Sequence, residues 1–226
     1  MIATPGQKVK LAVFADFHNG FTSPAGLQCS MPGYSSPVAS FSPNPVLHEG
    51  GTLLTLDTSG FAPGVHELTV QSMGGGLQPR VAAFTLDLRQ IGNVELFYTP
   101  FSSPVPLAGA TLTAQGDTSF STRVTDTNGV DITWDIPALP IVSSSPGIID
   151  VFLSASPWGN NSLLVHGSGN VTLTATSPDG RTWLTSLSSS VPAQPAFVSG
   201  TFWASPMPNT LGTTNHFAVA GTHSMS

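Results

Sequence analysis

The stretch that decides the fold covers residues 40–88, SFSPNPVLHEGGTLLTLDTSGFAPGVHELTVQSMGGGLQPRVAAFTLDL. It predicts three short β-strands, at residues 53–58, 65–70 and 81–88, separated by two turns rich in glycine and proline. No stretch before residue 90 has the apolar periodicity of a helix. The first part of the chain is therefore predicted to be all-β.

The residues before this stretch continue the same pattern. Apolar and polar side chains alternate over residues 8–17, which predicts a half-buried strand, and further strands are expected at 27–31 and 38–41. Pro43 and Pro45 remove two backbone donors, so the segment around them cannot belong to a central strand. About six or seven strands in roughly 90 residues, with frequent turn signals, predict a β-sandwich.

Composition narrows the class of partner. Only 8% of the 226 residues are charged, the net charge is −6, and the six Lys and Arg residues are not clustered. Nucleic acid is therefore not expected as a partner, because binding to phosphates needs clustered cations. No apolar run approaches the ~20 residues of a membrane helix, so no membrane insertion is expected. The single cysteine, Cys29, excludes an internal disulfide.

The second half of the chain predicts a second, larger β-sandwich. Turn pairs such as Asn128-Gly129 and Asp179-Gly180 are typical of hairpins. The expected strands and hairpins lie at 94–98, 108–114, 122–135, 148–154, 171–175 with 182–187, 197–204 and 216–220. We expect two domains, at residues 1–90 and 91–226.

The first 90 residues or so resemble the Ig-like repeats of bacterial secreted and cell-surface proteins. The resemblance rests on Pro5-Gly6, Asn19-Gly20-Phe21, Leu27-x-Cys29, Ser40-Phe41-Ser42-Pro43, Pro63-Gly64, Leu68-Thr69-Val70 and the turn at Gly74-Gly75-Gly76. It implies an Ig-like sandwich that acts as a spacer or adhesion module, with no catalytic residues. Two positions depart from the family: Ala39 replaces a frequent second cysteine, and His66 replaces an aromatic residue on the domain edge.

The hairpins of the second half share the style of the first. We therefore expect two tandem Ig-like antiparallel β-sandwiches, the second one larger and diverged. The chain begins almost directly with a strand and without a signal peptide, which favours a mature or excised piece of a longer exported protein.

One turn superficially resembles a calcium loop. It begins at Asp126 and ends at Asp131. The EF-hand spacing fails, because Gly129 is fourth rather than sixth and Pro137 stands where the bidentate glutamate belongs. A looser calcium site at Asp126 and Asp131 stays open, but a hairpin tip with solvated carboxylates is favoured.

Neither histidines nor serines predict an active site. Pairing across strands of His48 with His66, or of His166 with His216, stays open, although no two histidines share a strand face at i,i+2. The segment Gly167-Ser168-Gly169 lacks the five-residue spacing of a nucleophile elbow. We therefore expect no enzyme, no catalytic residues, no metal site and no cofactor.

All four tryptophans lie in the second half. Trp134 and Trp183 fall in expected hairpin strands and are interpreted as packing residues. Trp158, between Pro157 and Gly159, is expected in a loop. Trp158 and Trp203 are the candidate ligand-binding residues, because an exposed indole can stack on a sugar ring.

Three functions follow as hypotheses. The main one is a non-enzymatic structural or adhesive module of an exported bacterial protein, extracellular or on the cell surface, which provides spacing and display. The first alternative is a carbohydrate-binding module that uses tryptophans of the second domain. The second is a subunit of an extracellular filament or viral fibre, in which a terminal strand such as 216–220 completes the sheet of a neighbour. The expected partners are accordingly glycans or copies of the chain itself.

Overall fold

The computed structural model describes residues 1–15, 23–34, 38–47, 50–73, 80–98, 103–154 and 161–191. These residues form sixteen β-strands in four sheets, and every regular element among them is a strand. The prediction of an all-β chain is confirmed. Within the described ranges there is no helix long and apolar enough to span a membrane.

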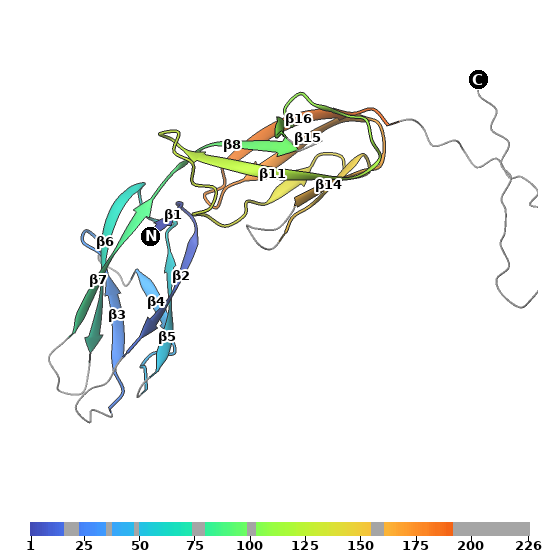
Figure 1. Ribbon diagram of the computed structural model, residues 1–226. Helices are drawn as coiled ribbons and strands as arrows, with labels where there is room; N and C mark the ends of the chain where they lie inside the picture. The colour runs from blue at the N-terminus through green and yellow to red at the C-terminus, as the bar shows by residue number, and fades with distance from the viewer. Residues whose placement is uncertain are drawn as a thin grey trace, which may run out of the picture. The chain divides into compact units, whose positions relative to one another are not determined.

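The first seven strands form two sheets, ordered β1-β7-β6-β3 and β2-β5-β4 (Figure 1). Their bounds are Ile2–Ala3 (β1), Lys8–Phe14 (β2), Gly26–Ser30 (β3), Ala39–Ser42 (β4), Gly51–Asp57 (β5), Gly64–Met73 (β6) and Val81–Leu88 (β7). The third, sixth and seventh strands share one sheet, and the second, fourth and fifth share the other, as in an immunoglobulin domain. The short β1 pairs in parallel with β7, whereas the remaining neighbours are antiparallel.

The next nine strands repeat this arrangement. Their bounds are Ile91–Tyr98 (β8), Val105–Pro106 (β9), Thr111–Leu112 (β10), Gly116–Asp126 (β11), Ile141–Ser143 (β12), Ile149–Phe152 (β13), Asn161–Val165 (β14), Gly169–Thr176 (β15) and Thr182–Ser189 (β16). One sheet is ordered β10-β16-β15-β12 and the other β13-β14-β11-β8-β9. The strand order of the first two sheets is repeated in the second two, with every strand number higher by nine. The strands β8 and β9 are additions that the first sandwich lacks. The chain therefore contains two Ig-like sandwiches, and the second is larger and diverged, as predicted.

Each pair of sheets encloses its own hydrophobic core. In the first, Leu54 and Leu56 of β5 face Leu86 and Leu88 of β7, and all four side chains are buried. The second core is built from β8, β11, β13, β14, β15 and β16, together with side chains of the loops between strands, such as Ile132. Its fully buried members include Ile91, Ile132, Ile149, Leu163 and Leu173. Period-two alternation accounts for the strand residues of both cores, since every second side chain of a strand points to the same face.

The register of the two sandwiches matches at their last strands. Gly64 of β6 lies opposite Leu88 of β7, and Gly169 of β15 lies opposite Ser189 of β16. Both glycines have positive φ, +138° and +151°, a conformation that side chains disfavour. The penultimate strand of each sandwich therefore begins with a glycine in a positive-φ conformation.

Most strands predicted for the first half are confirmed, with small shifts at their ends. In the second half, the hairpin predicted over 122–135 is present only at its tip, around Asn128-Gly129, and its second arm does not form a strand. β11 ends at Asp126, and after a single bridge between Thr125 and Asp131 the chain turns away. Asp131 accepts a hydrogen bond from the Thr133 N–H at 3.0 Å, which closes a side-chain turn in place of a returning strand.

Three further details of the second half differ from expectation. The strand expected over 108–114 contains only Thr111–Leu112. The apolar strand Ile149–Phe152 lies at the edge of its sheet among the described residues, because β14, which was not predicted, lies between it and β11. The strands expected at 197–204 and 216–220 lie outside the described residues.

Candidate functional site

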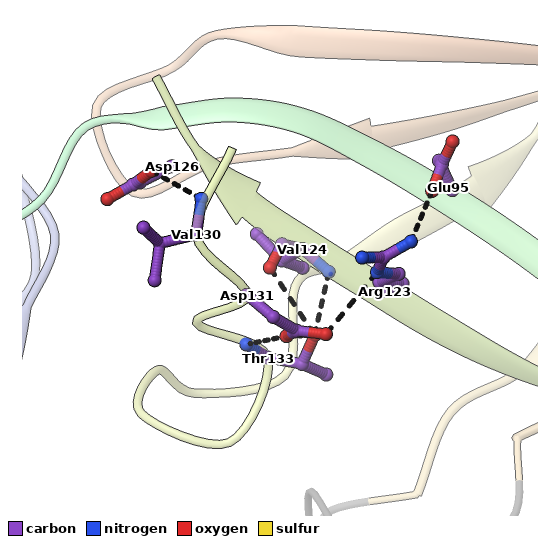
Figure 2. A network of polar contacts seen from close by, with 7 residues as sticks. All are labelled: Glu95, Arg123, Val124, Asp126, Val130, Asp131 and Thr133. Atoms are coloured by element: carbon purple, nitrogen blue, oxygen red, sulfur yellow. Dashed lines mark hydrogen bonds and ion pairs between the residues drawn. The ribbon is translucent and has the colours of Figure 1, made fainter. Parts of the chain in front are cut away.

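The polar network at the end of β11 is built around a buried carboxylate (Figure 2). Asp126 is only 5% exposed. One of its oxygens accepts hydrogen bonds from the N–H groups of Asn128, at 2.8 Å, and Val130, at 2.9 Å. The other lies 3.7 Å from the guanidinium of Arg89. Asp126 therefore shapes the Asn128-Gly129 turn from the inside, and the prediction that its carboxylate is solvated is wrong.

Asp131 is the exposed carboxylate of the same turn. One oxygen accepts from the hydroxyl and the N–H of Thr133, and the other lies 3.3 Å from Nε of Arg123, which also approaches Glu95 at 3.7 Å. Figure 2 shows these side chains arranged in a row from β8 across β11 to the loop. The Thr133 donors, with Arg123 beside them, hold the pKa of Asp131 below its ordinary value. The arrangement ties the loop to the sheet.

This geometry gives no support to a calcium site. The carboxylates of Asp126 and Asp131 both accept hydrogen bonds from the chain's own donors. Cation ligands in proteins are instead carboxylate and carbonyl oxygens that converge on one point. Within the described residues no three side chains of His, Cys, Asp or Glu lie together in a way that could hold a metal ion.

Two of the four tryptophans fall on described residues, and they differ. Trp183 is half-buried against the second core, its indole N–H lies 3.4 Å from the Gly92 carbonyl, and Arg181 stacks over its ring at 5.5 Å. The interpretation of Trp183 as a packing residue is confirmed. Trp134 is 61% exposed, so the same interpretation is wrong for Trp134. The candidate ligand residues Trp158 and Trp203 lie outside the described residues.

The two described histidines have structural contacts. His66 packs against Phe61, with ring centroids 5.8 Å apart, and its Nε2 lies 2.8 Å from the Ala62 carbonyl. It fills the place expected for an aromatic residue on the domain edge. His166 lies 3.0 Å from the carboxylate of Asp150 on the neighbouring strand. His48 and His216, their suggested partners, lie outside the described residues.

Ser168 and Cys29 also have structural surroundings. The Ser168 hydroxyl donates to the Val191 carbonyl at 2.7 Å, which holds the chain after β16. Cys29 is a free thiol, as predicted, and it is buried in the first core. Burial raises the pKa of the Cys29 thiol to about 11, so it carries little thiolate at neutral pH.

The outer face of β2 and β5 carries an exposed aromatic side chain that the sequence pattern does not single out. Phe14, the last residue of β2, is 80% exposed. Its ring lies over Gly51 of β5, where a Cβ would come within 3.1 Å of the ring edge. Lys8 and Lys10 share this face of β2 and are the two lysines of the chain. Lysine side chains are common on edge strands, so Lys8 and Lys10 are the sequence signal that β2 lies at the edge of its sheet.

Comparisons with known proteins return solved structures alone. No family description and no curated protein matches the chain. Domains 5–6 of the S-layer protein SbsC are 16% identical, with 85% of this chain and 93% of that chain covered and a TM-score of 0.31. The Escherichia coli adhesin FdeC is 20% identical, with 84% and 61% covered and a TM-score of 0.35. A C-terminal fragment of intimin, in complex with its receptor Tir, is 15% identical, with 82% and 60% covered and a TM-score of 0.28.

The Ig-like architecture itself rests on the order of the strands within the chain. In each sandwich a two-residue strand pairs in parallel with the last strand, β1 with β7 and β10 with β16. The first sandwich separates β3, β6 and β7 from β2, β4 and β5, and the second separates β12, β15 and β16 from β11, β13 and β14 in the same way. The resemblance of the first 90 residues to Ig-like repeats is therefore confirmed at the level of the fold.

Proposed function

We propose that the chain is a non-enzymatic structural or adhesive module of an exported protein, at the cell surface or outside the cell. Its division into units at residues 1–90 and 91–226 is part of the proposal and is supported by the two separate cores. The observation that carries it is the repetition of one sandwich design on either side of a two-residue connection, Arg89-Gln90. Repeated modules of this kind suit spacing and display.

The pairing of the first and last strands of the first sandwich suits a chain under tension. In the first sandwich, the N–H groups of Asp87 and Arg89 donate to the carbonyls of Met1 and Ala3, at 2.8 and 2.9 Å. In the second, Ser188 and Ser190 donate to Ala110 and Leu112 in the same way, at 2.9 and 2.8 Å. Because β1 and β7 are parallel and are the first and last strands of their sandwich, pulling on the two ends of the first sandwich loads these bonds together, in shear. The second sandwich begins with β8 in the other sheet, so its β10–β16 bonds lie inside the sandwich and are not loaded in this direct way.

Single-molecule force spectroscopy of the full chain between two handles tests this role. We expect two separate unfolding events, each releasing roughly 25–30 nm of chain. Ala3→Pro should lower the force of one event, because the backbone of Ala3 faces β7 and proline there removes a donor. Ile2→Pro is the matched control, since the backbone of Ile2 faces away from β7. A chain that extends without resolved unfolding events would contradict a mechanical role.

A second candidate function is binding to carbohydrate, with Trp158 and Trp203 as proposed ligand residues. The exposed indole of Trp134 favours this alternative, because it shows that the second sandwich presents at least one tryptophan to solvent. A glycan array with single alanine variants of Trp134, Trp158 and Trp203 tests it. Leu184→Ala, at a side chain 69% exposed, is the control for general loss of apolar surface. Binding that survives all three tryptophan variants would contradict the proposed residues.

A further inference from the structure

The strand β2 presents an open edge among the described residues, because it is the last strand of the sheet β2-β5-β4. Its backbone groups alternate between β5 and this edge. Gln7 and Ala15, at either end of the strand, bond directly to their opposite residues on the β5 side, Thr58 and Gly50. The odd residues therefore bond to β5, and the N–H and C=O groups of the even residues point to the open edge: Lys8, Lys10, Ala12 and Phe14.

The side chains of β2 show that the core is incompletely covered at this edge. Val9, Leu11 and Val13 all point inward, and Val9 is 5% exposed. Leu11 and Val13 are only partly buried, although they pack against the core. A strand laid beside β2 would cover both side chains and would satisfy the backbone groups of the even residues.

A second copy of β2 matches this edge in one register. If two β2 strands run antiparallel and position 8 lies opposite position 14, every residue of the seven-residue strand has a partner. The even residues then face one another as hydrogen-bonded pairs, which is the arrangement that their free N–H and C=O groups require. The inward pairs become Val9 with the partner's Val13, and Leu11 with the partner's Leu11.

Charge selects the same register. Lys8 lies opposite the partner's Phe14, so the ammonium group meets an exposed aromatic ring, and Lys10 lies opposite the partner's Ala12. A shift by two residues toward the first half of the strand would place Lys10 opposite the partner's Lys10, which is unfavourable. We propose that two copies of this chain associate through antiparallel pairing of their β2 strands, with position 8 opposite position 14.

The interface is short, and we expect a weak, reversible dimer. Sedimentation equilibrium of the full chain over a range of concentrations measures its dissociation constant. Ala12→Pro should raise this constant at least about tenfold, because it removes an N–H that points to the open edge and no bond to β5. Thr111→Pro makes the same change in β10, an edge strand of the other sandwich, and should leave the constant unchanged.

A charge exchange tests the register itself. Phe14→Lys places like charges opposite each other twice in the symmetric dimer and should weaken it about tenfold. Phe14→Glu faces Lys8 with an opposite charge and should bind at least as tightly as the wild type. Combining Lys8→Glu with Phe14→Lys should restore the dimer, because opposite charges then face each other. Combining Lys8→Glu with Phe14→Glu should weaken it, because like charges then face each other. Leu53→Lys, on the same face of the central strand β5, is the control and should change little.

Several outcomes would overturn the proposal. One is a chain that stays monomeric up to about 1 mM, a concentration at which weak interfaces still associate. Another is a dimer that Ala12→Pro leaves intact, or whose response to the charge variants does not reverse with Lys8→Glu. Polymers that disappear when residues 216–220 are deleted, and that tolerate Phe14→Lys, would assign the association to the terminal strand instead. Circular dichroism of each variant establishes that it is folded.

Discussion

Ser189 occupies in the second sandwich the position that Leu88 occupies in the first, since each lies opposite the positive-φ glycine that begins the preceding strand. Leu88 fills the first core, whereas Ser189 places a hydroxyl in the second, where it is 4% exposed and its oxygen has no hydrogen-bond partner within the described part of the chain. The second sandwich therefore buries an unsatisfied polar group at the point where the first buries an apolar side chain.

We predict that Ser189→Ala stabilises the second sandwich by about 1 kcal/mol, because it removes a buried polar group without a partner. Urea unfolding measures the change. Ser188→Ala is the matched control: the Ser188 hydroxyl lies 2.8 Å from that of Thr111, so its loss should be neutral or destabilising. Equal effects of the two variants would contradict this account.

The glycines opposite these residues give a second prediction. Alanine at Gly169 would meet both a positive φ and the Cδ1 atom of Ile148, 2.7 Å from the position of its Cβ, whereas nothing lies within 4 Å of a Cβ at Gly64. Gly64→Ala should cost about 1–3 kcal/mol from backbone strain alone. Gly169→Ala should cost more, and thermal unfolding compares the two. A smaller loss of stability for Gly169→Ala than for Gly64→Ala would show that the Ile148 side chain moves aside without a cost in free energy.

The two aspartates of the β11 turn should differ in their contribution to stability. Asp126→Ala removes the buried carboxylate that accepts from the N–H groups of Asn128 and Val130 and should cost about 2–3 kcal/mol, because hydrogen bonds to a charged group are the stronger ones. Asp131→Ala removes exposed contacts and should cost no more than about 1 kcal/mol. Urea unfolding with and without added calcium measures both. An increase in stability of the wild type on addition of calcium would contradict the assignment of these carboxylates to internal hydrogen bonds.

The buried thiol of Cys29 predicts a slow reaction with thiol reagents. With a pKa of about 11 and 1% exposure, Cys29 should react with a thiol reagent at pH 8 only as fast as the first sandwich opens. Denaturant should make the reaction immediate. Ser30→Cys in a Cys29→Ala background provides the control, because Ser30 is exposed on the other face of β3 and should react at once. Rapid labelling of native Cys29 would show that the core opens locally there.

The sequence supports the architecture well because sandwich strands follow from local rules. Alternation in β2 and β5 and the glycine turns at Gly64 and Gly180 place strands and turns without reference to distant residues. The same rules misplace elements whose position depends on neighbours. The apolar strand Ile149–Phe152 lies at an edge because β14 pairs between it and β11. Since β11 and β14 are far apart in the sequence, local rules do not reveal that they pair.

Side-chain roles were harder to predict than strands. Asp126 and Asp131 have the same residue type in one turn, yet burial separates them, and burial is set by the packing of β8 and β11. Trp134 and Trp183 likewise each follow a threonine in the sequence, yet Trp134 is exposed and Trp183 is half-buried. The open edge of β2 left a weak signal, the alternation of Lys8 and Lys10 with apolar residues, but only the sheet order identifies an edge.

The parallel pairing of first and last strands also sets a direction. Because β1 and β7 run the same way, the polypeptide enters the first sandwich at one end and leaves it at the opposite end. A strand of eight residues such as β7 spans roughly 26 Å. Antiparallel first and last strands would return the chain to its starting end and add no distance. In this design the first sandwich carries the chain forward by about its own length.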